Sequence, residues 1–241
     1  MNRTEQSPLY GFLKFGRKQD LQEFRNDGLL YMRPLAEFAK LEESATGRGD
    51  DFEGITKIIQ PKHVGKLIFD PGIAGLGKIT VPPSDLAGPV RIRLNKTTSC
   101  DVYCMVALTI PTDLTIPADK ALVGLVSSEV VGFGDSFVIV TNVTEFISRV
   151  VLTVKDEKNG VSYLESGLVD YYDAGEDSGE IGRFRKRSKF AYQNEFRIVV
   201  EPGSDAPRRL FVGSLLDITS EILPSSAALE PCRFTMDHTT A

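Results

Sequence analysis

The sequence of 241 residues has no tryptophan, and it has few of the residues that carry zinc and serine-hydrolase chemistry, with only two histidines and three cysteines. An odd cysteine count in a chain this long does not make a disulfide framework, so we expect a reducing compartment. Cys100 and Cys104 are expected to be small buried apolar residues. With only His63 and His238 available, and no Gly-x-Ser-x-Gly elbow, zinc enzymes and Ser-His-Asp hydrolases are disfavoured.

Long apolar runs and excess positive charge are also missing. No apolar run approaches the roughly 20 residues of a membrane helix, and the first residues lack the apolar core of a secretory signal. The formal net charge of −5 is opposite to what general nucleic-acid binding requires. Gly-x-Gly-x-x-Gly is absent, and the glycines at 72–77 lack the Lys-Ser/Thr ending of a phosphate loop. We therefore expect a cytoplasmic protein without a membrane or general nucleic-acid partner.

What is present indicates an ordinary globular chain, 41% hydrophobic and 25% charged. Apolar segments between Gly and Pro predict strands at 9–15, 29–32, 90–94, 102–110, 137–140, 161–164, 190–200 and 209–212. Short segments between 52 and 89 favour hairpins and edge strands. Helices are predicted at 19–26, ended by Gly28, after Pro34, and after Asn142, which fits a reciprocal cap with Glu145. These elements predict a single α+β domain over residues 1–223, with a strand-rich mixed or antiparallel sheet core and few short helices, followed by a flexible tail at 224–241.

Charge is unevenly distributed late in the chain. Six acids and no base lie in residues 165–180, and six bases with one acid lie in residues 181–200. One interpretation is a solvated acidic loop that neutralises its basic neighbour. The other is an anion-binding strand, formed by Arg185, Lys186 and Arg187, that a mobile acidic flap screens. In a strand, Arg185 and Arg187 share one face.

The segment 190–200 carries the strongest candidate site. Read as one strand, its even positions are mostly apolar and face a core, while Gln193, Glu195 and Arg197 share the other face, about 6 to 7 Å apart from one to the next. A row of three polar groups on a strand otherwise built for burial is more than solvent exposure demands. The alternative is a solvent-facing strand with a modest ion pair.

Gln193-x-Glu195 resembles the Gln/Glu-x-Glu signature of the ADP-ribosyltransferase superfamily. The resemblance implies that Glu195 is the catalytic acid, which hydrogen-bonds the ribose of NAD and stabilises an oxocarbenium-like transition state. It implies that Gln193 positions the acceptor. The opening strand–helix–Gly–strand unit is also similar to the start of that fold. On this reading NAD is a substrate, and no metal is required.

The NAD contacts of that family are only partly matched. The family places an Arg or His on its first strand, where residues 9–15 offer Tyr10 and Lys14. Its Ser-Thr-Ser element is absent from the second strand, which offers Tyr31. We therefore assign Tyr10, Lys14, Tyr31 and Arg197 as the candidate NAD-binding residues.

A broader likeness covers most of the chain. It resembles a group of uncharacterised bacterial and phage-borne proteins in the segments at 28–32, 37–38, 48–54, 133–136, 192–197 and 212–218. The likeness implies a bacterial or phage origin and no established activity.

The Arg-Gly-Asp-Asp-Phe-Glu-Gly segment at 48–54 is a second cluster. Asp50, Asp51 and Glu53 carry oxygen ligands suited to Mg²⁺ or Ca²⁺, although a polar turn is the favoured interpretation. Whether Arg48 and Asp51 border the same cleft as Glu195 is left open by the sequence.

Three functions are therefore kept. The first is an NAD-consuming transferase or glycohydrolase that depends on Glu195. The second is a non-catalytic anion- or partner-binding accessory protein of a bacterial defence or mobile-element locus. A small-molecule nucleotide or a protein is the expected partner. A nuclease that uses the 48–54 cluster ranks lower.

Overall fold

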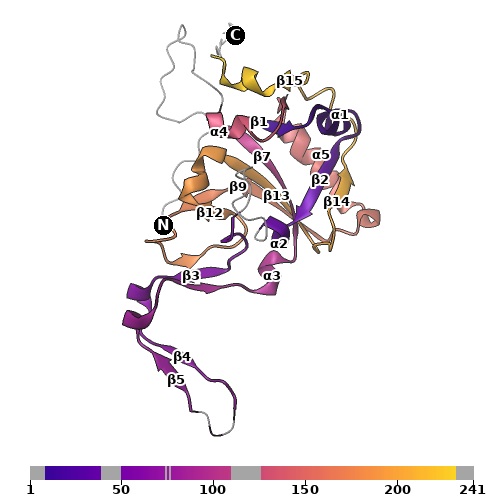
Figure 1. The fold of residues 1–241 in the computed structure, drawn as a ribbon. Coiled ribbons are helices and arrows are strands. Elements are labelled where there is room, and N and C mark those ends of the chain that lie inside the picture. Colours follow the sequence, from indigo (N-terminus) through magenta and orange to yellow (C-terminus); the bar gives the residue numbers. More distant parts are fainter. Residues whose placement is uncertain (1–8, 39–49, 74, 76, 110–125, 232–241) are drawn as a thin grey trace, which may run out of the picture.

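The computed structural model describes residues 9–38, 50–73, 75, 77–109 and 126–231 (Figure 1). One eight-stranded antiparallel sheet dominates the fold, which confirms the predicted α+β class. Its strands are β1 (Leu9–Gly16), β2 (Leu29–Pro34), β7 (Asp101–Thr109), β8 (Ser136–Val140), β9 (Tyr163–Leu168), β13 (Glu195–Glu201), β14 (Arg208–Phe211) and β15 (Leu223–Pro224).

Strand β7 is central, as its nearly continuous apolar sequence predicts. β13 pairs with one edge of β7 from Asp101 to Val106. The other edge is shared: β1 pairs at one end of it and β2 at the other, so the sheet divides there. The Lys14 ammonium donates to the carbonyl oxygen of Cys104 in this division, at 3.0 Å.

Two helices cover one face of the sheet. α1 (Lys18–Asp27) ends as predicted at Gly28, whose φ of 66° is the left-handed conformation that glycine adopts without strain. α5 (Val143–Lys155) begins at Asn142, whose Oδ1 accepts from the Glu145 N–H at 3.0 Å. The Glu145 carboxylate does not complete the reciprocal cap, because it pairs with Arg149 at 2.8 Å. No helix in the described ranges is both long enough and apolar enough to cross a membrane.

The main core lies between these helices and the sheet. Phe12 of β1 contacts Phe146 of α5 and Phe196 of β13, and the ring of Phe24 in α1 stacks on Tyr103 of β7. The opposite sheet face carries a smaller apolar cluster around Leu13, Val106, Phe137 and Ala228. That face also carries the polar groups described below. Alternation along β13 divides the two environments, because successive strand residues face opposite sides.

Smaller sheets flank the main one. β3 (Lys57–Ile59) pairs with β6 (Val90–Ile92) and β11 (Gly179–Glu180), β10 (Asp170–Tyr172) pairs in parallel with β12 (Arg185–Arg187), and β4 (Leu67–Phe69) forms a hairpin with β5 (Ile79–Val81). The hairpin expectation for residues 52–89 is confirmed. Three further α-helical turns of the described residues are α2 (Leu35–Phe38), α3 (Asn95–Thr98) and α4 (Ser128–Val131), and short 3₁₀-helices lie at Pro61–His63, Pro83–Asp85 and Glu157–Asn159.

The strand predicted over 190–200 is wrong in its first half. Residues Ser188–Gln193 form a 3₁₀-helix, and β13 begins only at Glu195. Asn194 ends the helical turn with φ 38°, and its side-chain amide donates to the Ala107 carbonyl at 2.6 Å. Asn tolerates this left-handed conformation better than most residues, because its short side chain hydrogen-bonds the nearby backbone. Gln193 therefore does not lie on the strand with Glu195.

Two further boundaries differ from expectation. The segment assigned to a tail begins inside the fold: β15 pairs with β8, and Ser225 and Ala228 of the 3₁₀-helix Ser225–Leu229 are buried. The acidic stretch at 165–180 contains most of β9 and all of β10 and β11 rather than one loop. Residue 110, Arg48 and residues 232–241, with His238, lie outside the described residues.

Candidate functional site

Glu195 and Arg197 project from β13 on the sheet face away from α1 and α5. Their partners across the ladder are Val106 and Cys104. The intervening Phe196 and the following Ile198 belong to the main core, as the sequence predicts. Both polar side chains are nevertheless buried, Glu195 at 5% exposure and Arg197 at 2%. The interpretation as a solvent-facing strand is therefore wrong.

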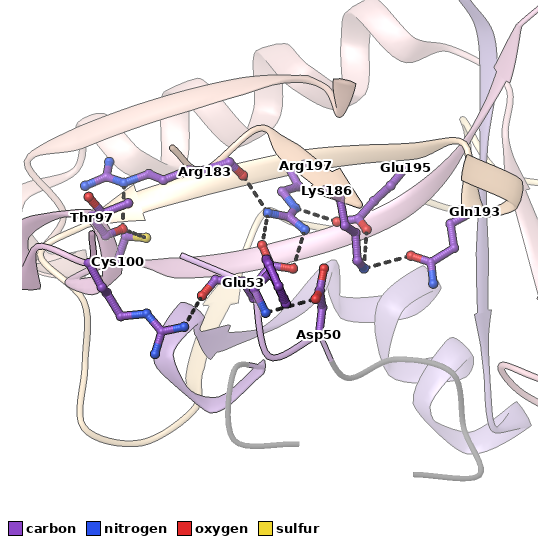
Figure 2. A network of polar contacts seen from close by, with 11 residues as sticks. Asp50, Glu53, Thr97, Cys100, Arg183, Lys186, Gln193, Glu195 and Arg197 are labelled. Atoms are coloured by element: carbon purple, nitrogen blue, oxygen red, sulfur yellow. Dashed lines mark hydrogen bonds and ion pairs between the residues drawn. The ribbon is translucent and has the colours of Figure 1, made fainter. Parts of the chain in front are cut away.

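Arg197 joins two carboxylates (Figure 2). Its Nε binds Glu195 Oε1 at 2.5 Å, and its two terminal nitrogens bind Glu53 Oε1 and Oε2 at 2.7 and 3.1 Å. The Nη1 group also donates to the Arg183 carbonyl at 2.5 Å. The two-pronged geometry toward Glu53 is the arrangement in which a planar guanidinium binds a carboxylate best.

Lys186 supplies the second cation of the site. Its ammonium donates to Gln193 Oε1 at 2.8 Å and to Glu195 Oε2 at 3.2 Å. Although the strand expected for Gln193 is wrong, the amide and the Glu195 carboxylate still meet, at one buried ammonium. Figure 2 shows Lys186 between these two side chains.

The acids at 50, 51 and 53 lie in or beside the same network. Arg187 binds Asp50 Oδ1 at 2.6 Å and Asp51 Oδ1 at 2.7 Å. Asp50 also accepts from the Phe52 N–H at 3.0 Å, which forms the polar turn that the sequence favours. Lys186, Arg187 and Arg197 of the basic segment are thus neutralised by Glu195 and the acids at 50, 51 and 53, while Arg183 pairs with Glu201. Two acids of the 165–180 stretch pair outside the basic segment, Glu176 with Lys62 and Glu180 with Lys57.

Burial and neighbouring charges move the pKa of three groups in the network away from their ordinary values. Burial tends to raise the pKa of Glu195, but Arg197 and Lys186 outweigh burial and hold that pKa well below its usual range. Burial likewise tends to lower the pKa of Lys186, and the charges of Glu195 and Glu53 raise it overall. Burial, and then the charge of Glu195, raise the pKa of the neighbouring Cys104 thiol to about 12.

These shifts limit the chemistry of the site. A general acid or base works best when its pKa lies near the working pH, and these carboxylate, ammonium and thiol groups are all moved away from it. Both carboxylate oxygens of Glu195 bind cations, Arg197 and Lys186. The backbone N–H of Glu195 donates to Tyr171 Oη at 2.9 Å. The arrangement is suited to fixing loop 50–55, β12 and β13 together.

The candidate NAD-binding residues do not gather around Glu195. The Lys14 ammonium lies 4.0 Å from the centre of the Tyr103 ring, which stacks on Phe24 of α1, so Lys14 is on the opposite sheet face. Tyr10 and Tyr31 are exposed on β1 and β2. Of the four candidates, only Arg197 contacts Glu195.

The three candidate anion-binding residues already have partners. Lys186 and Arg187 take part in the ion pairs described above. The Arg185 guanidinium lies 5.3 Å from the Tyr172 ring centre and donates to the Glu180 carbonyl at 2.8 Å. Arg185 and Arg187 do share one face of β12, as expected, while Lys186 points into the protein.

Two surface hollows in the described part of the chain lie away from Glu195. One is between α5 and β9, around Val154 and Tyr163, and the other is around Thr97 and Arg183. Neither is lined by Gln193 or Glu195. Across the described ranges, no three His, Cys, Asp or Glu side chains are grouped so as to hold a metal ion.

A projecting β-hairpin lies apart from all of the predicted site residues. The described residues of 65–80, which we call the arm, project away from the main sheet with the β4–β5 hairpin (Figure 1). Every described residue of the arm except Pro71 is exposed. Five of them are large apolar residues: Leu67, Ile68, Phe69, Ile73 and Ile79. The sequence signal was present, because the apolar triplet 67–69 and the Ile-Thr-Val segment 79–81 flank a glycine-rich turn, but this pattern does not distinguish a projecting hairpin from a buried one.

Comparison of the chain with known protein-family models, curated proteins and solved structures finds no match.

Proposed function

We propose that this protein is a non-catalytic binding module that engages another polypeptide through the arm. The observation that carries the proposal is the arm itself, a projecting hairpin whose apolar side chains have no cover among the described residues. Exposed apolar surface of this kind marks interaction sites, because leaving it in water costs free energy. A two-stranded hairpin is also marginally stable alone in water, so a partner would stabilise it.

The state of Glu195 supports the same proposal. A carboxylate that stabilises a developing positive charge must face the reacting atoms. Here both oxygens face cations of the protein, and the residue is 5% exposed. An NAD ribose would have to displace Lys186 or Arg197, leaving a buried cation without its partner.

The proposal is tested by site-specific photocrosslinking in cells that produce the chain. A benzoylphenylalanine side chain is introduced at Phe69, and in a matched control at Leu152, which is also a large apolar residue of similar exposure but lies on α5. We expect one discrete crosslinked product from position 69, identified by mass spectrometry and lost when Ile79→Asp is added. Absence of a product from position 69, or equal products from both positions, would contradict the proposal.

The NAD-consuming enzyme is retained as a second candidate because of one specific contact. Gln193 and Glu195 both bind the Lys186 ammonium, so the two side chains of the resembling signature are adjacent. If this candidate is correct, Glu195→Gln abolishes NAD turnover in a protein that remains folded. Turnover unaffected by that substitution would remove this candidate.

A further inference from the structure

The unpaired outer edge of β4 and the sequence of that strand indicate which partner the arm binds. Among the described residues, β4 pairs only with β5, so its outer edge has no strand partner. An exposed edge strand with unpaired backbone groups is a template for another strand. Bilayer insertion is disfavoured, because unpaired backbone N–H and C=O groups are costly in hydrocarbon.

The sequence of β4 and its flanks is complementary to itself. Residues 66–70 read Lys-Leu-Ile-Phe-Asp. When two copies of this segment pair antiparallel about Ile68, Leu67 of each copy lies opposite Phe69 of the other, and Lys66 lies opposite Asp70. Directly opposite residues share a sheet face, so both the apolar and the oppositely charged pairs are in contact.

Only this register pairs the charges. Shifting the centre to Leu67 or Phe69 places Lys66 opposite Ile68 or Gly72. Lys66 makes no ion pair within the described residues, and it cannot reach Asp70 of its own strand, because four residues of extended chain span about 13 Å. Asp70 binds Lys78 at 3.3 Å through Oδ2 and accepts from the Gly72 N–H through Oδ1, and a carboxylate has lone pairs left for a further cation.

The other edge of the arm is a poor template. β5 is followed at once by Pro82, which has no N–H to donate to a neighbouring strand. Antiparallel self-pairing of β5 about Thr80 would set Lys78 opposite Pro82, with no complementary charge. The outer edge of β4 is therefore the favoured one.

We infer that the arm pairs with the arm of a second copy of this chain, β4 against β4 about Ile68, to form a four-stranded intermolecular sheet. This inference rests on the proposed function, which it makes specific by naming the partner. The pairing is isologous, since one two-fold axis relates the two copies. It also extends the apolar face of Leu67, Phe69, Ile79 and Val81 across both β4–β5 hairpins.

Charge reversal tests the register. Sedimentation velocity over a concentration series measures dimerisation of the wild type, Lys66→Asp and Asp70→Lys. Each single variant sets like charges opposite each other twice, and we expect dimerisation to weaken by about tenfold or more. Mixing the two variants places opposite charges at both pairs again and restores a dimer, which rules out misfolding as the cause of the loss. A wild type that stays monomeric throughout, or single variants that dimerise like the wild type, would overturn the inference.

Engineered cysteines test the edge. Ile68→Cys places two thiols directly opposite, where the Cα atoms of an antiparallel pair lie about 4.5 to 5.5 Å apart, within disulfide range. Thr80→Cys is the matched control, because in the same sheet the two control thiols are separated by about 14 Å, three strand spacings. We expect a disulfide-linked dimer from Ile68→Cys alone, measured against the unmodified chain. Linkage through Thr80→Cys instead would overturn the assignment to β4.

The outcomes also separate this inference from the proposed function. A monomeric chain whose position 69 crosslinks a different protein in cells overturns the inference and leaves the binding module standing. A monomeric chain whose arm is needed to co-sediment with anionic vesicles assigns the arm to a lipid surface and overturns both. No crosslink from the arm, with a monomeric chain, also overturns both.

Discussion

Arg197 and Glu53 lie 144 residues apart in the sequence and meet in a two-pronged ion pair, with side chains that are 2% and 1% exposed. This pair attaches the 50–55 turn to the central sheet. Through Arg197 it is continuous with Glu195, and through Glu195 with Lys186. We interpret these residues as a buried anchor.

Removing the central cation should be costly. Arg197→Met leaves the carboxylates of Glu53 and Glu195 buried without the guanidinium that pairs with both of them. We expect the free energy of unfolding to fall by about 3–5 kcal/mol. Lys62→Met removes the exposed Lys62–Glu176 pair and should cost no more than about 1 kcal/mol. Urea denaturation followed by circular dichroism measures both. Equal costs would show that the network is no anchor.

The double variant Arg197→Met/Glu53→Met tests the reason for that cost. If the penalty comes from an unpaired buried carboxylate, removing Glu53 as well should return part of the lost stability. A double variant that is as unstable as the sum of the single variants would instead assign the cost to lost packing.

The stability of the protein should depend on pH through Glu195. Its pKa in the folded protein is lowered from the ordinary value of 4.5, so the ionised carboxylate stabilises the fold above that pH, and this contribution is lost as pH falls below it. The difference in unfolding free energy between the wild type and Glu195→Gln should therefore be largest near neutral pH and shrink in acid. Glu176→Gln, at an exposed position, controls for loss of a surface charge. A difference that stays constant from neutral pH into acid would contradict the assignment.

The two described cysteines should be unreactive in the folded protein. Burial raises the pKa of Cys100 to about 11 and that of Cys104 to about 12, so neither thiol is ionised at neutral pH. In a Cys232→Ser background, alkylation by iodoacetamide should be slow in the native state and fast in urea. Thr80→Cys in the same background supplies an exposed thiol for comparison. Native-state alkylation as fast as at that position would show that the thiols are accessible.

The glycine at the end of α1 should tolerate no side chain. Gly28 has φ 66°, and a Cβ built on it overlaps the carbonyl oxygen of Gly213. Gly160 has a similar φ of 60° with open space around it. Gly160→Ala should cost about 1–2 kcal/mol for the left-handed backbone, and Gly28→Ala about 1–3 kcal/mol more for the overlap. Thermal or urea unfolding of both variants measures the difference, and equal costs would contradict the overlap.

The sequence predicted most of what depends on local pattern. Most strand positions, the Gly28 end of α1 and the Asn142 cap follow from alternation and capping chemistry, which neighbouring residues determine. The even face of β13 was also predicted, because burial of Phe196 and Ile198 follows from strand periodicity.

The missed features depend on long-range contacts. The helical turn before Glu195 is held by Asn194 bonding to β7, about 87 positions earlier in the chain. The pairing of Glu53 with Arg197 joins two clusters that the sequence presents as separate. The exposure of Phe69 could not be predicted either, because the sequence of an apolar hairpin is the same whether the fold buries the hairpin or leaves it projecting.

The central claim is that Glu195 is an anchor and does not meet a nucleotide. Nicotinamide release from NAD, measured for the wild type, Glu195→Gln and the exposed control Glu165→Gln, tests it most directly. All three proteins should match buffer without protein, across pH and acceptor conditions. Turnover by the wild type and Glu165→Gln that disappears in a folded Glu195→Gln protein would contradict it.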